Sequence, residues 1–271
     1  MTLKSSTRML LFSIFGYPVT HSISPRLHNS VLQALKLDGC YVRKAITEPE
    51  KLLSIFHAMK LTGANVTVPH KEAAYEQCDE VRGIAKEIGA VNTLVREGER
   101  VIGYNTDAEG FYEAIKSFGY IRNALILGAG GTAKAIAIIL KSHDIETTIL
   151  NRSASRLSFF ASRGFTCQTW DTFESKPYDL IINTTSAGLK DEEYPCDKEL
   201  LKTIFKGSKY AFDVIYNKPT PFLELARSCN IRCKDGKEML LYQGVLAFNL
   251  FFSKHYDLKT IETLMRPAFE L

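Results

Sequence analysis

A glycine-rich turn at residues 128–133 has the most specific chemical pattern in this chain. Its sequence, GAGGTA, has the G-x-G-x-x-A spacing of a dinucleotide-binding turn. Gly128 permits a tight turn, Gly130 lets the backbone approach a pyrophosphate, and the small Ala133 allows a helix to pack closely on the preceding strand. Free amide groups at the start of that helix would bind the phosphates. A glycine turn without a ligand is the alternative interpretation.

The sequence that follows the next strand-like run, NRSASR at residues 151–156, indicates NADP rather than NAD. An NAD site usually has Asp or Glu at this place, where it binds the ribose 2′-hydroxyl. This chain has Asn151, Arg152, Ser153 and Arg156 instead. Arginine binds a 2′-phosphate through charge-assisted, often bidentate hydrogen bonds, whereas a carboxylate would repel it. The alternative is that the two arginines belong to an ordinary solvated helix start.

Two serines near the N-terminus, Ser22 and Ser24, lie just before Pro25 at the expected start of a helix. Ser24 fits the role of helix cap, with Pro25 in the first turn. Capping by Ser24 leaves Ser22 without a role, and two hydroxyls beside free helix amides would also bind a carboxylate. The spacing alone leaves both interpretations open.

Further polar residues of the first half lie at the ends of predicted strands. Alternation places Asn65 and Thr67 on one face, and Pro69 ends that strand, so Lys71 begins the next helix, where sites of parallel sheets open. Asn92 is expected inside an otherwise apolar strand, and Asp107 directly precedes a helix. Taken singly, a lysine here is usually solvated and an aspartate here usually caps its helix.

The elements that must position these residues alternate between strands and helices. Strands are expected at residues 9–15, 40–46, 64–68, 90–95, 100–106, 124–127, 146–150, 179–185 and 210–216, and the fourth and fifth are joined by a turn at 97–99. This alternation predicts an α/β fold with mostly parallel sheets. A domain boundary is expected near residues 107–110, followed by a Rossmann domain. From residue 236 onward the chain is helical, and this tail is expected to return to the first domain.

The overall composition excludes several classes of protein. With 45% hydrophobic and 24% charged residues, the chain is neither disordered nor collagen-like. A net charge of +4 is too small to indicate a nucleic-acid partner. No apolar run is long enough to span a membrane, and no signal peptide is recognisable. We therefore expect a cytoplasmic protein with reduced thiols.

The six cysteines give no reason to expect a metal site. Cys229 and Cys233 lie four residues apart in a pattern typical of a helix, but neither a CxxC motif nor a histidine at ligand spacing accompanies them. We interpret them as core or surface thiols and expect no metal.

Several motifs occur in a fixed order between residues 21 and 244: HSISP, NVTVPHK, AVNTL, GYNTDAEGF, GAGG, NRS, DVIYNKPTPF and DGKEMLLYQG. Together they resemble the shikimate dehydrogenases, which reduce 3-dehydroshikimate with NADPH on the way to chorismate and the aromatic amino acids. The resemblance implies a substrate domain of residues 1–107 with the helices of 238–271, and an NADP-binding Rossmann domain of residues 108–237. The active site would lie in the cleft between them.

The resemblance also implies a role for individual residues. Lys71 and Asp107 would form the catalytic pair, with Lys71 as proton donor and acceptor. Shikimate, a small-molecule ligand, would be bound by Ser22, Ser24, Asn65, Thr67, Asn92, Asp107, Tyr216 and Gln243. NADP would be bound by Gly128, Ala129, Gly130, Gly131, Thr132, Asn151, Arg152, Ser153, Arg156, Val214 and Gly236. Val214 departs from the methionine of some similar enzymes, which puts its side-chain contact in doubt.

Two alternatives stay open at this point. One is a quinate/shikimate dehydrogenase with relaxed use of NAD and NADP. Arg152 and Asn151 argue against the use of NAD, but they say little about quinate. The other is a non-catalytic dinucleotide-binding module. A monomer and a homodimer are both compatible with the sequence.

Overall fold

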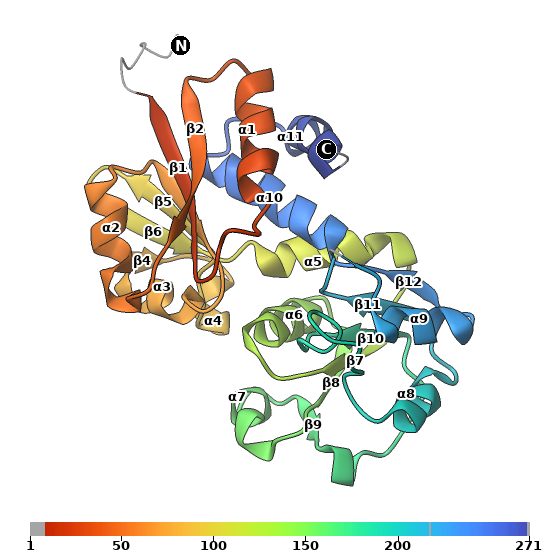
Figure 1. Ribbon diagram of the computed structural model, residues 1–271. Coiled ribbons are helices and arrows are strands. Elements are labelled where there is room, and N and C mark those ends of the chain that lie inside the picture. Colours follow the sequence, from red (N-terminus) through yellow and green to blue (C-terminus); the bar gives the residue numbers. More distant parts are fainter. Residues whose placement is uncertain (1–8, 217, 270–271) are drawn as a thin grey trace. The chain divides into compact units, whose positions relative to one another are not determined.

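The computed structural model describes residues 9–216 and 218–269, and it divides into two compact units (Figure 1). Unit 1 combines the chain up to Thr106 with the chain from Leu241 onward, and unit 2 spans Asp107–Leu240. The chain therefore passes from unit 1 into unit 2 at the start of one helix, and it passes back within another.

Unit 1 is built on a six-stranded mixed sheet with the strand order β2-β1-β3-β5-β6-β4. Its strands are β1 (Leu10–Gly16), β2 (Gly39–Ala45), β3 (Gly63–Val66), β4 (Glu80–Val81), β5 (Thr93–Glu97) and β6 (Arg100–Tyr104). β1 pairs in parallel with β2 and β3, whereas β5 runs antiparallel to β3 and β6. The hairpin of β5 and β6 turns at Gly98, whose φ of 65° favours glycine, as the sequence predicted.

Helices cover both faces of this sheet. They are α1 (Ser24–Ala34), α2 (Leu52–Ala58), α3 (Lys71–Gln77), α4 (Ala85–Ile88), α10 (Lys237–Phe251) and α11 (Leu258–Met265). Side chains of β1 point to both faces: Phe15 belongs to the core that includes Phe56 of α2, and Phe12 packs against Phe251 of α10 with ring centroids 5.0 Å apart. The C-terminal helices α10 and α11 thus return to the first unit beside α1 (Figure 1), which confirms the prediction.

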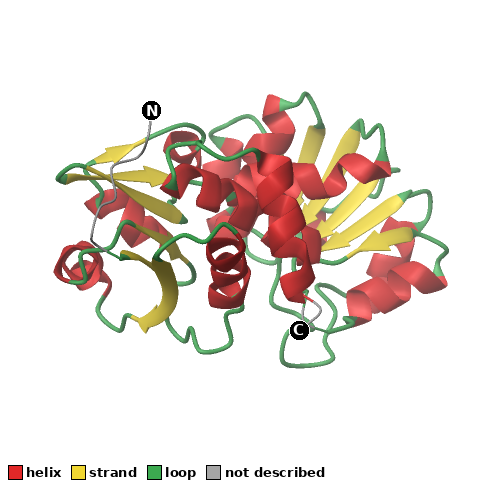
Figure 2. Ribbon diagram, turned by 90° about the horizontal axis from the view of Figure 1, so that it is seen from above, coloured by secondary structure: helices red, strands yellow, loops and turns green. Residues whose placement is uncertain are grey.

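Unit 2 contains a fully parallel six-stranded sheet with the order β12-β11-β10-β7-β8-β9. Its strands are β7 (Asn123–Leu127), β8 (Glu146–Leu150), β9 (Thr166–Gln168), β10 (Leu180–Asn183), β11 (Tyr210–Asp213) and β12 (Arg232–Lys234). Figure 2 shows this sheet as a fan of strands with helices on both sides. A parallel sheet requires such cover, because crossover helices lie on its faces.

The helices of unit 2 pack on the two faces through alternating strand residues. They are α5 (Asp107–Ile115), α6 (Gly131–Ser142), α7 (Ser158–Ala161), α8 (Lys198–Phe205) and α9 (Pro221–Ser228). Ala211 of β11 belongs to a core with Phe205 of α8 and Phe222 of α9. The next residue, Phe212, meets Phe111 of α5 edge-to-face at 5.0 Å on the other side.

The predicted α/β fold with two mostly parallel sheets is confirmed, and some details of the prediction were wrong. The short strands β4, β9 and β12 were not predicted, because two or three residues carry no periodic pattern. Cys229 ends α9 and Cys233 lies in β12, so they do not share a helix face. No helix among the described residues is both long and apolar enough to cross a membrane.

Candidate active site

Polar residues of unit 1 collect beside the point where its sheet reverses direction. From β1 the chain crosses to β2 on one side, and from β2 it returns to β3 on the other side of β1. Ligands of α/β sheets bind at such a switch point, beyond the carboxyl ends of the strands. The segment after β1 carries Ser22 and Ser24, and the segment after β3 carries Thr67 and Lys71.

Ser24 does not cap the first helix, and its hydroxyl lies beside that of Ser22 instead. The cap position belongs to Ile23, and Ser24 is already the first helical residue. The Ser24 amide donates a hydrogen bond to Ser22 Oγ (3.3 Å), and Ser22 Oγ lies 3.2 Å from Ser24 Oγ. Both serines are buried, and Arg43 Nε binds the Ser22 carbonyl at 2.8 Å. The two hydroxyls therefore form a fixed pair beside the helix start.

Asn65 lies at the centre of a buried hydrogen-bond network under this site. Its Oδ1 accepts from the Tyr41 hydroxyl (2.8 Å), and its Nδ2 donates to Thr93 Oγ1 (3.1 Å) and to the Asn92 carbonyl (3.3 Å). Burial raises the pKa of Tyr41 well above its ordinary value, so the phenol stays protonated and donates. Asn65 thus connects β2, β3 and the start of β5, and both ends of its side-chain amide are hydrogen-bonded.

A continuous series of bonds connects the position of Lys71 with that of Asp107. The Val91 amide donates to the Lys71 carbonyl (2.9 Å), and the next residue, Asn92, binds Thr106 through both ends of its side-chain amide. Asn92 Oδ1 accepts from the Thr106 amide (2.8 Å), and Asn92 Nδ2 donates to Thr106 Oγ1 (3.0 Å). Asp107 follows Thr106 directly and begins α5. Asn92 itself precedes β5 and does not lie within the strand, which corrects the prediction.

The glycine turn of unit 2 connects β7 to α6, as its spacing predicted. Gly128 has a φ of 109°, and a Cβ there would lie 2.7 Å from Thr184 Oγ1, so glycine is required. Gly130 occupies the cap position of α6 and has no side chain that could bond the first amides of the helix. A Cβ at Gly130 or Gly131 would meet open space. The first amides of a twelve-residue helix thus lie at the end of β7, where an anion is stabilised.

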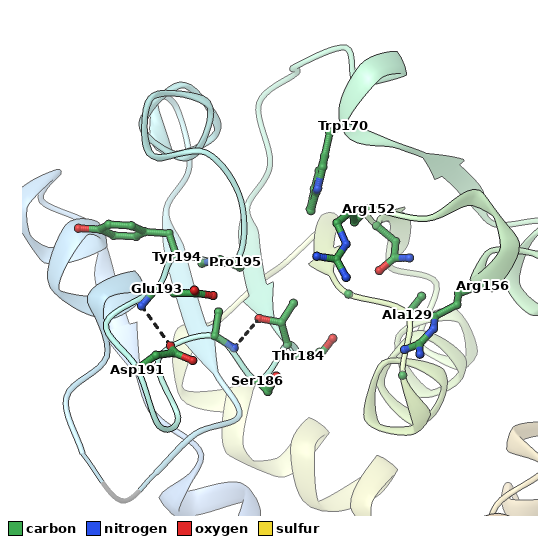
Figure 3. A pocket seen from close by; sticks show the side chains of 15 residues that line it. Ala129, Arg152, Arg156, Trp170, Thr184, Ser186, Asp191, Glu193, Tyr194 and Pro195 are labelled. Carbon is green, nitrogen blue, oxygen red and sulfur yellow. Dashed lines mark hydrogen bonds between the residues drawn. The ribbon is translucent and has the colours of Figure 1, made fainter.

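A pocket of about 380 Å³ lies beyond the ends of β7, β8 and β10 (Figure 3). Of the predicted cofactor residues, six line it: Gly128, Ala129, Gly130, Asn151, Arg152 and Arg156. Gly131, Thr132 and Ser153 adjoin these in the chain but do not line the pocket. Residues that the sequence did not indicate form the remaining walls: Trp170, Thr184–Ala187, Asp191 and Glu193–Pro195.

The charges around this pocket suit an anionic ligand at one end. Arg152 and Arg156 are exposed, and their guanidinium groups form no ion pair with any residue that the structure describes. Asn151 is tied by its Nδ2 to the Ser153 carbonyl at 2.9 Å. Asp191 faces the pocket from another wall, where amides of Gly188 and Glu193 lower its pKa.

Val214 and Gly236 contact each other within unit 2, but neither lines this pocket. A Cβ at Gly236 would collide with the Val214 backbone, so only glycine fits. The buried carboxylate of Asp213 holds this segment by accepting hydrogen bonds from Thr220 Oγ1 (2.7 Å) and the Ile215 amide (3.1 Å). Burial raises the pKa of Asp213 to about 6.

Burial also raises the pKa of Tyr216, a predicted substrate residue, and its phenol therefore remains a donor at neutral pH.

The remaining predicted substrate residue, Gln243, is buried on the part of α10 that belongs to unit 1. Thr67 is half-buried and follows the last residue of β3, and its amide donates to the Phe15 carbonyl at 2.8 Å. In the described parts of the chain, no group of three or more His, Cys, Asp or Glu side chains could hold a metal ion.

Comparison with known proteins identifies the family. Residues 14–94 match the family model described as the shikimate dehydrogenase substrate binding domain. The chain is 51% identical over 253 residues to a shikimate dehydrogenase (NADP(+)) of Helicobacter hepaticus, with 93% of this chain and 94% of the relative covered. The chain belongs to the shikimate dehydrogenase family. The resemblance recognised in the sequence is thereby confirmed.

Two further relatives agree with this assignment. A shikimate dehydrogenase (NADP(+)) of Helicobacter pylori is 44% identical over 262 residues, which cover 95% of this chain and 98% of the relative. A crystal structure of the Thermus thermophilus shikimate dehydrogenase, in complex with NADP(H) and shikimate, is 34% identical. It has a TM-score of 0.83 and covers 96% of this chain and 100% of that one.

One signal could have indicated part of the missed pocket wall. The polar run TTSA at residues 184–187 directly follows β10, and β10 lies across β7 from β8. A strand that crosses to the other side of β7 marks the second switch point, and its following segment belongs to the site. The sequence does not determine the strand order, and only the structure places the segment after β10 beside the glycine turn.

Proposed function

We propose that the protein reduces 3-dehydroshikimate to shikimate with NADPH in the biosynthesis of chorismate and the aromatic amino acids. The observation that supports this activity best is the hydrogen-bonded series from Lys71 through Asn92 to Thr106, which ties the Lys71 backbone to the residue before Asp107; these are the two residues that would transfer the proton. The activity in the names of the relatives is the same.

Unit 2 has the features that NADP requires. The glycine turn leaves room for a pyrophosphate, and the start of α6 offers free amides. Arg152 and Arg156 would bind the 2′-phosphate, and Asn151 stands where an NAD site carries a carboxylate. Ser153 would contribute at the same end, and Gly131, Thr132, Val214 and Gly236 would complete the cofactor-binding set. When bound, NADPH supplies the hydride that reduces the substrate carbonyl.

Unit 1 would supply most of the residues that bind the substrate, and Asp107 and Tyr216 of unit 2 would supply the others. The paired hydroxyls of Ser22 and Ser24 would bind the carboxylate, next to the backbone amides of the α1 start. The ring hydroxyls would be bound by Thr67, Asn92, Asp107, Tyr216 and Gln243. Asn92 retains one amide hydrogen for this purpose, since only one is used on Thr106. We assign Asn65 to the support of these residues, because its side chain is already bonded to three neighbours.

Lys71 would be the proton donor in reduction and the acceptor in oxidation. Its ammonium would stabilise the negative charge that develops on the substrate oxygen and then deliver the proton. Asp107 would orient that ammonium and accept a hydrogen bond from the same substrate hydroxyl. The Lys71 cation would perform the electrostatic role that a metal performs in other dehydrogenases.

The first experiment is a steady-state assay of the purified protein with shikimate, in parallel with NADP and NAD. The absorbance of the reduced nicotinamide reports turnover. We expect reduction of NADP and little reduction of NAD, because Arg152 and Arg156 form part of the pocket. The same assay with quinate measures substrate range.

The other outcomes lead to the two alternatives. Comparable rates with NAD, or activity on quinate, would indicate a quinate/shikimate dehydrogenase. Binding of NADP without turnover of either polyol would indicate a non-catalytic dinucleotide-binding module and would contradict the assignment of Lys71.

A further inference from the structure

Trp170 lines the pocket that we assign to NADP, and it has no role in the function proposed so far. It is the single tryptophan of the chain. It lies two residues beyond the end of β9, at the first position of a short 3-10 helix, Trp170–Thr172.

The fold holds this side chain beside the predicted phosphate-binding arginine. Leu150 of β8 pairs with Gln168 of β9, and the Asn151 amide donates to the Gln168 carbonyl at 3.1 Å. The segments that carry Arg152 and Trp170 therefore leave the sheet side by side. Figure 3 shows the indole extending toward Arg152.

The position of the indole is fixed from two directions. Thr169 and Thr172 form a reciprocal capping box at the start of the 3-10 helix, with Thr172 Oγ1 accepting from the Thr169 amide at 3.0 Å. The indole also packs against the hydrophobic core of unit 2. It is half-buried, so its remaining surface is available to the pocket.

The chemistry of NADP determines what should lie against this surface. The adenine and the 2′-phosphate are attached to neighbouring carbons of one ribose. If Arg152 and Arg156 bind the phosphate, the adenine occupies the adjacent part of the pocket. An aromatic face is well suited to a purine. The other aromatic residue of the pocket, Tyr194, lies on the opposite wall (Figure 3).

We propose that Trp170 is an adenine-binding residue of the cofactor site, with its indole against the purine ring. The proposal rests on NADP binding by unit 2, which belongs to the proposed function. It requires nothing of Lys71, Asp107 or the substrate.

The test uses the fluorescence of the wild-type protein, which reports on Trp170 alone. The ligands are adenosine 2′,5′-bisphosphate, which contains the adenine and the 2′-phosphate, and nicotinamide mononucleotide, which contains neither. We expect the first to quench or shift the emission in proportion to its binding, measured independently by calorimetry, and the second to leave it unchanged.

A set of variants separates the purine contact from the phosphate contact. Trp170→Ala should raise the Kd of adenosine 2′,5′-bisphosphate by about 5- to 100-fold, the usual effect of removing an aromatic ring from a base. It should raise the Kd of 5′-AMP by the same factor, because both ligands contain adenine. Arg152→Gln, the matched control, should weaken only the bisphosphate. Trp170→Phe should retain most of the affinity, and it also provides the emission blank.

Three results would overturn the proposal. They are unchanged emission of the wild type at saturating bisphosphate, unchanged affinity of Trp170→Ala, and a loss in Trp170→Ala confined to the 2′-phosphorylated ligand, which would mean that Trp170 acts through Arg152. If the wild type binds NADP while any of these occurs, only the assignment of Trp170 fails. If it does not bind NADP at all, the proposed function fails as well.

Discussion

The residues predicted to act in unit 1 and those predicted to act in unit 2 are held in different ways. Ser22, Asn65 and Asn92 are buried, and each side chain is hydrogen-bonded within unit 1: Ser22 to Ser24, Asn65 to Thr93 and Asn92 to Thr106. Arg152 and Arg156 are exposed on a short segment after β8, without an ion partner among the described residues.

This difference corresponds to two kinds of task. A group that acts in a transition state must be fixed before the reaction, because reorganisation during the step raises the barrier. A cation that binds a phosphate needs only charge and access, and flexible side chains on the surface supply both. Substitutions in unit 1 should therefore change turnover or stability, and substitutions of the arginines should change cofactor affinity alone.

The largest effect is expected for Lys71→Ala. Without the ammonium, turnover should fall by about 10²-fold or more, the usual contribution of a general acid–base group, while the Kd of NADP stays unchanged. Steady-state kinetics and a separate titration of NADP measure the two quantities. Lys86→Ala, which removes an exposed lysine of α4 in the same unit, is the control and should leave both unchanged. If turnover stays near that of the wild type and only substrate affinity falls, Lys71 is a binding residue.

A smaller loss, this time of stability, is expected for Asn92→Ala. The substitution removes the acceptor of the buried Thr106 amide and one partner each of the Thr106 and Thr93 hydroxyls, which still contact each other at 3.3 Å. Each buried polar group left unsatisfied costs about 1–3 kcal/mol. We expect the free energy of unfolding to fall by about 2–4 kcal/mol, together with turnover, because the segment before Asp107 loosens. Denaturant unfolding followed by circular dichroism measures the first quantity. A fully stable Asn92→Ala variant would contradict the view that this network is preorganised.

For Arg152→Asp we expect a change in cofactor preference with no change in stability. Losing a charge-assisted bond to the 2′-phosphate should raise the Kd of NADP by about 10- to 100-fold, whereas the affinity for NAD should hold or improve. Arg227→Asp makes the same change of charge on α9, at a residue that does not line the pocket, and it should not alter this ratio. The preference of the wild type for NADP should weaken with added salt, because the arginines are exposed. Unchanged NADP affinity in Arg152→Asp would contradict the division between the units.

The division also explains which features could be predicted from the sequence. The fold class and the glycine turn depend on local patterns, namely the alternation of strands and helices and the spacing of Gly128 and Gly130. Both are confirmed. Lys71 and Asp107 were located at helix starts by the same reasoning, and α3 and α5 do begin there.

The features that were missed depend on which segments become neighbours. Trp170 follows a three-residue edge strand that has no periodic pattern, and it reaches the pocket only because β9 pairs with β8. Asn92 precedes its strand because its side chain is directed to Thr106, fourteen positions later in the chain. The cap position belongs to Ile23 rather than Ser24, because the helix starts one residue earlier than expected, which lies within the uncertainty of any boundary.

Two histidines, one in each unit, should differ in their effect on how the free energy of unfolding depends on pH. His28 is buried in unit 1 and stacks on Tyr41 with ring centroids 4.3 Å apart, and neither of its ring nitrogens has a hydrogen-bond partner within residues 9–216 and 218–269. His143 is exposed in unit 2, where it stacks on Tyr112 at 3.6 Å. Burial lowers the pKa of His28 from 6.5 to about 3, because the charged imidazolium loses its hydration.

The sign of the pH effect follows from this shift. Between pH 6.5 and about 3 the unfolded chain binds a proton at His28 that the folded protein does not, so the free energy of unfolding falls as the pH falls. The slope that His28 contributes is at most about 1.4 kcal/mol per pH unit. His28→Phe retains the stacked ring and should remove this slope, whereas His143→Phe, the control, should not. The measurement is the difference between variant and wild type across the pH range, since Asp213, with its pKa raised to about 6, contributes a slope of opposite sign to both. Equal slopes in His28→Phe and the wild type would show that the imidazole of His28 is hydrated or paired in solution.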